Sequence, residues 1–119
     1  MTTKTRLADI YLRFLQLRET LRGLPSLPPL DPLEERILSW IAKASVEQAR
    51  ISVRGMMAKE EFGSPATVHG RLKSMRRKGW IMLTDTEDAR RKQIELTQAA
   101  LLYFDQLSDC MVKAAKDGS

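Results

Sequence analysis

The basic residues of this chain are concentrated in one segment, residues 64–92, where they could bind phosphate groups. That segment holds eight of the 20 lysines and arginines but only three of the 15 acidic residues. Basic and acidic residues are equal in number in the rest of the chain, so the segment accounts for the whole formal net charge of +5. Such a localised cationic surface is typical of proteins that contact the phosphates of a nucleic acid.

Residues suited to catalysis or metal binding are few. The chain has a single histidine, His69, and a single cysteine, Cys110, which cannot form a zinc site or a catalytic pair between them. It has no glycine-rich phosphate loop and no paired carboxylates in an apolar setting. We therefore expect no enzyme activity, no cofactor and no metal. Cys110 is either a thiol sensor or an inert buried residue, and its apolar neighbours favour the second.

The sequence predicts one domain, mainly α-helical with a small β-hairpin. Apolar residues recur at helical spacing over residues 4–23 and again over residues 97–116. Between them, residues 31–97 carry helix starts at Asp31, Ser52 and Ser64, and short strand patterns at 80–84 and 93–97. No apolar run is long enough for a membrane span, and the N-terminus lacks a signal-peptide core, which favours a cytoplasmic protein.

Two short helices separated only by Gly63, followed by a basic hairpin, predict a winged helix-turn-helix. In the second helix, residues 64–78, we expect Val68, Leu72 and Met75 to point inward. The outward residues are then Ala66, Gly70, Lys73 and Arg77, with Thr67, His69, Ser74 and Arg76 beside them. The side chains on this face are small near the start of the helix and cationic further along, which suits insertion into the DNA major groove.

The hairpin tip, residues 85–92, is a candidate for contact with the adjacent minor groove. Asp88 and Arg90 are spaced for an ion pair that would leave Arg91 or Lys92 facing outward. The candidate DNA-binding residues are Ser64, Ala66, Thr67, His69, Gly70, Lys73, Ser74, Arg76, Arg77, Asp88, Arg90, Arg91 and Lys92.

Gly70 has two explanations, because a glycine within a helix costs about 1 kcal/mol relative to alanine. It could allow close approach to DNA, or it could allow a tight contact with another element of the protein.

The terminal helices carry more apolar surface than a small winged domain needs, which predicts a homodimer. A two-fold dimer would place its recognition helices roughly 34 Å apart, one turn of DNA. The predicted interface residues are Leu7, Ile10, Tyr11, Phe14, Leu17, Leu21, Leu101, Phe104, Leu107 and Met111.

Residues 30–97 resemble the multiple antibiotic resistance regulator (MarR) family of winged-helix repressors. The resemblance lies in Thr67-Val68, Met75 to Gly79-Trp80, Asp88-Ala89-Arg90 and Leu96-Thr97. It implies an obligate homodimer on a pseudo-palindromic operator, with Arg90 in the minor groove. Gly70 and Leu83 depart from the family pattern, because members often carry basic residues there.

The MarR resemblance also implies a small aromatic effector. Tyr11, Trp40 and Phe104 would border its crevice, although aromatic residues at helical spacing are more often part of a core.

We interpret the chain as a sequence-specific regulator of transcription that binds double-stranded DNA, and specifically as a repressor. The alternative is a protein-interaction winged helix whose basic face docks an acidic partner.

Overall fold

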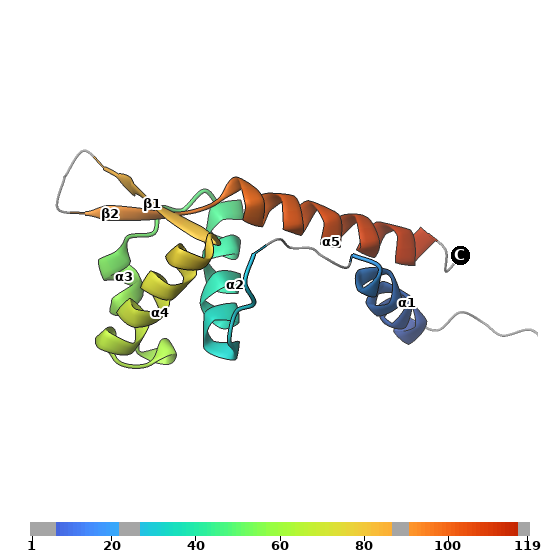
Figure 1. The fold of residues 1–119 in the computed structure, drawn as a ribbon, viewed down its shortest axis with the longest axis horizontal. Coiled ribbons are helices and arrows are strands. Elements are labelled where there is room, and N and C mark those ends of the chain that lie inside the picture. Colours follow the sequence, from blue (N-terminus) through green and yellow to red (C-terminus); the bar gives the residue numbers. More distant parts are fainter. Residues whose placement is uncertain (1–6, 22–26, 87–90, 117–119) are drawn as a thin grey trace, which may run out of the picture. The chain divides into compact units, whose positions relative to one another are not determined.

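The computed structural model describes residues 7–21, 27–86 and 91–116. Along the chain, the elements are α1 (Leu7–Glu19), α2 (Pro32–Val46), α3 (Val53–Met57), the 3-10 helix η1 (Glu60–Phe62), α4 (Pro65–Lys78), β1 (Ile81–Asp85), β2 (Lys92–Leu96) and α5 (Gln98–Lys116) (Figure 1). The mainly helical fold with one hairpin, predicted from the sequence, is confirmed.

The elements form two compact units, and the boundary between them falls within α5. We call residues 27–100 the winged unit. The helical unit comprises α1 and the part of α5 after Ala100.

The winged unit is organised around the inner faces of α2, α4 and the hairpin. Its fully buried side chains include Ile37, Ile41, Met56, Val68, Met75 and Ile81. The strands β1 and β2 pair antiparallel, in a register that runs from Ile81 opposite Leu96 to Asp85 opposite Lys92. The Ile94 N–H donates to the Ile51 oxygen at 2.8 Å, which ties β2 to the connection before α3.

Local signals fix the ends of the helices as the sequence predicts. Asp31 and Glu34 form a reciprocal capping box at the start of α2, and Ser52 and Ser64 cap α3 and α4. Gly79 ends α4 with a left-handed backbone at φ 88°, a conformation that glycine adopts at little cost. Thr97 accepts the Ala100 N–H at 3.1 Å, which caps the first turn of α5.

Three predicted boundaries differ from the structure. Thr20 and Leu21 are not helical, because their N–H groups bond three residues back and tighten the last turn of α1. The helix predicted to start at Ser52 and to end at Gly63 is divided at Lys59, whose backbone is extended and whose ammonium lies over the Trp40 ring at 4.0 Å. Each strand is displaced by one residue from the predicted range.

The displacement of β1 leaves Trp80 outside the strand and buried. Its indole N–H donates to the Pro28 oxygen at 2.8 Å, so the proline-containing segment before α2 packs on the end of α4.

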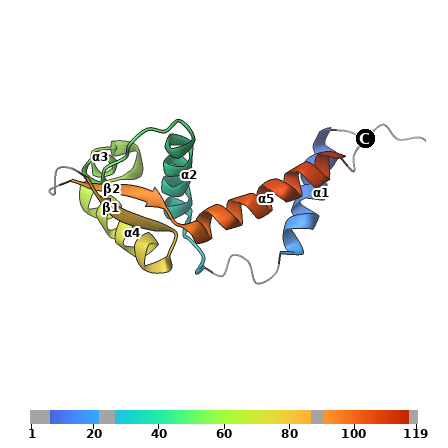
Figure 2. The same ribbon diagram turned by 90° about the horizontal axis from the view of Figure 1, so that it is seen from above.

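In the helical unit, α1 and α5 lie side by side in both ribbon views (Figure 2). The Arg13 guanidinium donates from Nε to the Ala114 oxygen at 3.0 Å, near the end of α5. Cys110 and Ala114 are buried in this unit. Within the described ranges, no helix combines the length and hydropathy that crossing a membrane requires.

Candidate nucleic-acid interface

The exposed face of α4 is the face that the sequence predicts. Val68, Leu72 and Met75 are buried against the winged unit. Ala66, Gly70, Lys73 and Arg77 are all exposed on the opposite side. The helix therefore presents small residues in its first half and cations in its second half.

The start of α4 is held by its own polar side chains. Ser64 Oγ accepts the Thr67 N–H at 3.1 Å and donates to Thr67 Oγ1 at 2.9 Å. Both side chains are exposed but already serve the cap. Because the residues between them are Pro65 and Ala66, the first turn carries no long side chain that would keep a ligand at a distance.

Gly70 has free space beside it. A Cβ atom built on Gly70 would meet no neighbouring atom within 4 Å. For the described part of the chain, this finding excludes the explanation that Gly70 allows a tight contact with another element. The other explanation, close approach to DNA, remains a prediction.

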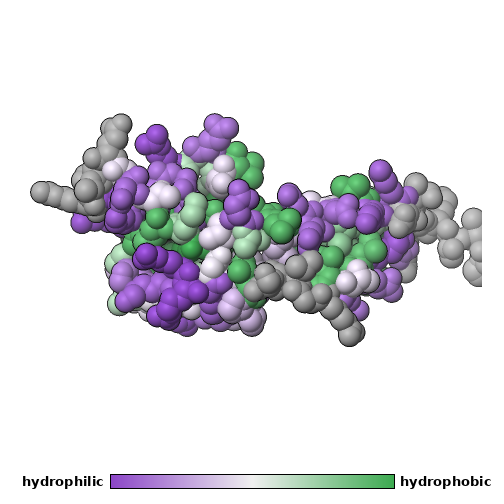
Figure 3. Space-filling view, turned by 45° about the horizontal axis from the view of Figure 1, so that its top comes forward, coloured by the Kyte–Doolittle hydropathy of each residue, from purple (hydrophilic) through white to green (hydrophobic). Residues whose placement is uncertain are grey.

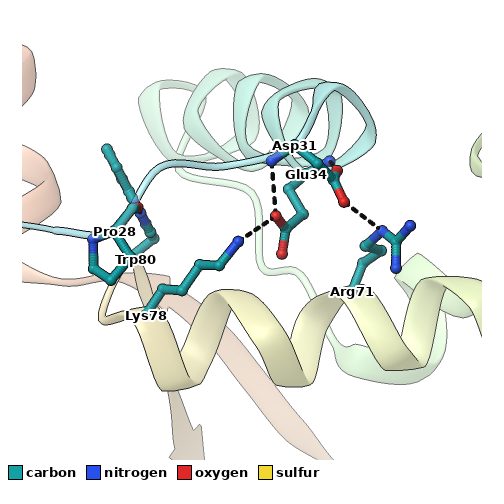
Figure 4. Close-up of polar contacts among 6 residues, drawn as sticks. All are labelled: Pro28, Asp31, Glu34, Arg71, Lys78 and Trp80. Carbon is teal, nitrogen blue, oxygen red and sulfur yellow. Dashed lines mark hydrogen bonds and ion pairs between the residues drawn. The ribbon is translucent and has the colours of Figure 1, made fainter.

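Two ion pairs hold α4 against the beginning of α2 (Figure 4). Lys78 Nζ lies 2.7 Å from Glu34 Oε1, and Arg71 Nε lies 2.9 Å from Asp31 Oδ2. The Glu34 side chain is 1% exposed, so its charge depends on the Lys78 ammonium beside it. Arg71 and Lys78 therefore belong to the α2 contact and not to the outward face.

The pKa of Glu34 reflects this setting. Burial raises the pKa, but the Asp31 N–H, the Lys78 ammonium and the Ser74 hydroxyl stabilise the carboxylate and lower the pKa below its ordinary value. The Asp31 N–H donates to Glu34 Oε1 at 2.8 Å, the same oxygen that receives Lys78. Glu34 is therefore a buried carboxylate, held in its charged form by contacts with α4 and with its own helix cap.

Ser74 is on the α2 side of α4 with Arg71 and Lys78. It is half-buried, and it contributes to the low pKa of Glu34. Of the residues predicted on α4 for DNA contact, Ser74 is the one that lies off the exposed face.

The outward cations of α4 are Lys73, Arg76 and Arg77. All three are exposed, and none forms an ion pair among the residues that the structure describes. His69 is exposed on the same side as Arg76.

The base of the wing is closed by interactions between its strands. Lys92 pairs with Asp85, the residue opposite it in the register, and Thr86 Oγ1 donates to the Arg91 oxygen at 2.9 Å. Arg91 and Lys92 are exposed. Asp88 and Arg90 lie outside the described residues, so their ion pair and the minor-groove arginine remain predictions.

A groove separates α4 from the wing. One hollow of about 820 Å³ lies between α3, the start of α4 and the hairpin, and a second of about 260 Å³ continues along α4. Both are lined by Val53, His69 and Leu83, and we call them together the α4–wing groove. In the space-filling view, hydrophobic surface lies between hydrophilic patches on this unit (Figure 3).

Arg54 on α3 also lines the α4–wing groove, although no sequence pattern indicates this residue. Its neighbourhood depends on the approach of the β1–β2 hairpin to α3 and α4, so neither helical periodicity nor a local motif could have indicated its position. The sequence predicts Asp31 only as a helix start, although Asp31 and Glu34 also form ion pairs with α4.

The predicted interface residues in the helical unit differ in exposure. Leu7 and Tyr11 are 85% and 61% exposed, and Leu101 and Met111 are also exposed. The other predicted residues are half-buried: Ile10, Phe14, Leu17, Leu21, Phe104 and Leu107.

The residues proposed to border an effector crevice belong to different units. Tyr11 and Phe104 are in the helical unit, whereas Trp40 is in the winged unit, where Lys59 covers its ring. The burial of Cys110 agrees with the inert alternative for this residue.

Comparison with known families identifies the winged unit. Residues 28–90 match the family model of the LexA DNA-binding domain. The matched residues make up more than half of the chain. The chain belongs to this family. The searches of curated proteins and of solved structures gave no match. LexA-type domains are winged helix-turn-helix domains, so the predicted DNA-binding regulator with double-stranded DNA as its partner is supported at this level.

The match covers the α2 to α4 region, including the helix-turn-helix and the Glu34 contact. The narrower assignment to the MarR family is not supported by the match and remains a prediction.

The contact between Glu34 and Lys78 predicts a pH-dependent stability of this LexA-type domain. Substitution Glu34→Gln removes the carboxylate that pairs with Lys78, so the free energy of unfolding should fall by about 1–3 kcal/mol at neutral pH. A lowered folded-state pKa stabilises the fold above the ordinary glutamate pKa, and this stabilisation is lost as the pH falls through the folded value. Urea unfolding at neutral pH and at about pH 3 should therefore show a smaller difference between the two proteins in acid.

The matched control is Glu35→Gln, which changes an exposed glutamate on the same helix. It should change the stability little at either pH. A Glu34→Gln effect of the same size at both pH values would contradict the role of the Glu34 charge.

Proposed function

We propose that the protein is a transcriptional repressor of the MarR type, which binds a pseudo-palindromic operator as a homodimer in the cytoplasm. Helix α4 enters the major groove, and the wing, residues 85–92, reaches the adjacent minor groove. In this proposal the protein acts by occupying DNA, without catalysis and without a cofactor.

The exposed face of α4 is the observation that carries this proposal. Its first half has only small side chains at the outward positions, Ala66 and Gly70, so the helix backbone can approach base edges. Lys73 and Arg77 follow one and two turns later on the same face, where they can meet phosphates. The order of small residues and then cations along one helix face is better suited to a DNA groove than to a flat acidic protein surface.

The homodimer is supported by apolar residues exposed in the helical unit. Beside Leu7 and Tyr11 on α1, the side chains of Leu102, Met111 and Val112 on α5 are more than half exposed. A soluble chain rarely leaves so many large apolar side chains in water within two helices. The MarR resemblance supports the same use of these helices and the repressor role.

Replacing the outward cations should weaken DNA binding and its dependence on salt. We expect Lys73→Ala and Arg77→Ala each to reduce the slope of log affinity against log salt by about 0.9, because each removes one phosphate contact. Fluorescence anisotropy with a labelled random-sequence duplex measures this slope. Lys43→Ala, an exposed lysine on α2, is the matched control and should leave the slope unchanged.

If the wild-type protein does not bind the duplex even at low salt concentration, DNA binding is refuted and an acidic protein partner is favoured. Equal slopes for Lys73→Ala, Arg77→Ala and Lys43→Ala would instead refute the proposal that this face of α4 contacts the DNA phosphates.

Substitution of Gly70 should change stability and DNA affinity in opposite directions. Gly70→Ala should raise the free energy of unfolding by about 1 kcal/mol, because alanine favours the helix and the space beside Gly70 is empty. The added methyl group should weaken binding by about tenfold to a duplex selected by the wild-type protein from a random pool. Gly70→Leu should weaken it further.

Urea unfolding and anisotropy measured on the same preparations test both effects. A more stable Gly70→Ala protein that binds the selected duplex as tightly as the wild type would show that α4 does not approach DNA at this position.

Charges placed in the apolar surface of the helical unit should dissociate the dimer. We expect the double variant Tyr11→Glu, Leu102→Glu to be monomeric in light scattering, because both positions are more than half exposed and would be buried between two copies. Val46→Glu is the matched control, since Val46 is 83% exposed in the winged unit. A wild-type protein that is itself monomeric at micromolar concentration would refute this interface.

A further inference from the structure

The α4–wing groove has an apolar floor and cations at both ends. Val53 and Leu83 line both hollows, and Met57 lines the larger one. Lys73 and Arg76 border the smaller hollow, whereas Arg54, Arg91 and Lys92 border the larger one. A groove of this composition fits a ligand that alternates apolar and anionic groups.

The sugar–phosphate backbone of DNA has this alternation, because each apolar deoxyribose is followed by a charged phosphate. If α4 lies in the major groove and the wing lies in the adjacent minor groove, the strand that separates those grooves must pass between them. The α4–wing groove occupies that space. We propose that it holds the backbone of one DNA strand and that Arg54 of α3 binds a phosphate of this strand.

Arg54 is a cation of the larger hollow that is not compensated by an ion pair with any described residue. Lys92 pairs with Asp85 across the hairpin, so part of its charge is compensated. Arg54 is exposed and forms no ion pair within residues 7–21, 27–86 and 91–116. A guanidinium can donate two parallel hydrogen bonds to one phosphate, which fixes the position of that phosphate on the protein.

The apolar floor explains why Arg54 would bind a phosphate within a DNA strand and not a free phosphate ion. Val53, Met57 and Leu83 offer contact to the sugar face between phosphates but no hydrogen bonds to an anion. Phosphate and sugar contacts of this kind set the register of a protein on DNA without reading its sequence. Arg54 is thus a positioning residue, which complements the outward cations of α4.

This inference rests on the proposed DNA binding, and substitutions of Arg54 test it separately. We expect Arg54→Ala to reduce the slope of log affinity against log salt by about 0.9, measured by anisotropy with a labelled random-sequence duplex. Arg54→Lys should keep the slope, because it retains the charge. Arg54→Glu should weaken binding more than Arg54→Ala does.

Arg50→Ala is the matched control, because Arg50 is an exposed arginine four residues earlier that does not line the groove. Circular dichroism should show the same helix content for all variants. If the wild type binds the duplex and Arg54→Ala has the slope of Arg50→Ala, the groove assignment is overturned while DNA binding stands. If the wild type does not bind, the proposed function itself fails.

Discussion

The position of α4 depends on one buried carboxylate. Glu34 is the charged side chain that the structure buries in its described part, and it accepts both the Asp31 N–H and the Lys78 ammonium. A carboxylate removed from water is costly unless it is paired and hydrogen-bonded, so this contact constrains where the last turn of α4 can lie. The neighbouring pair of Arg71 with Asp31 adds a second contact between α4 and α2, about two turns earlier on α4 and near the surface. Together with the burial of Val68, Leu72 and Met75, the two pairs favour one rotation of α4 about its own axis.

That rotation determines which basic residues face outward. Arg71 and Lys78 are used internally, whereas Lys73, Arg76 and Arg77 remain on the exposed side with Ala66 and Gly70. The net charge of residues 64–92 therefore overstates the charge that a ligand meets on α4. What distinguishes the surface is its order, with small side chains first and cations later, bordered by the α4–wing groove. This order, together with membership of the LexA DNA-binding domain family, underlies the proposed docking on DNA.

The sequence predicted the parts of this structure that depend on local signals. Asp31, Ser64 and Gly79 begin or end helices through contacts within a few residues, and the spacing of Val68, Leu72 and Met75 gives the inner face of α4. The contact of Lys78 with Glu34 was not predicted, because the two residues are 44 positions apart and no local pattern connects them. The same reason applies to Arg54 in the groove and to Ser74, whose half-buried setting depends on α2. The assignment to the MarR family rested partly on Asp88 and Arg90, which lie outside the described residues.

The central claim is that DNA lies along the exposed face of α4 and in the groove beside it. Nuclear magnetic resonance of the labelled full chain, titrated with a short random-sequence duplex in dilute buffer, tests this claim residue by residue. The account predicts that amide shifts concentrate at Ala66, His69, Gly70 and Lys73 and at Arg54 across the groove. Shifts confined to α1 and α5, or a spectrum that the duplex leaves unchanged, would contradict it.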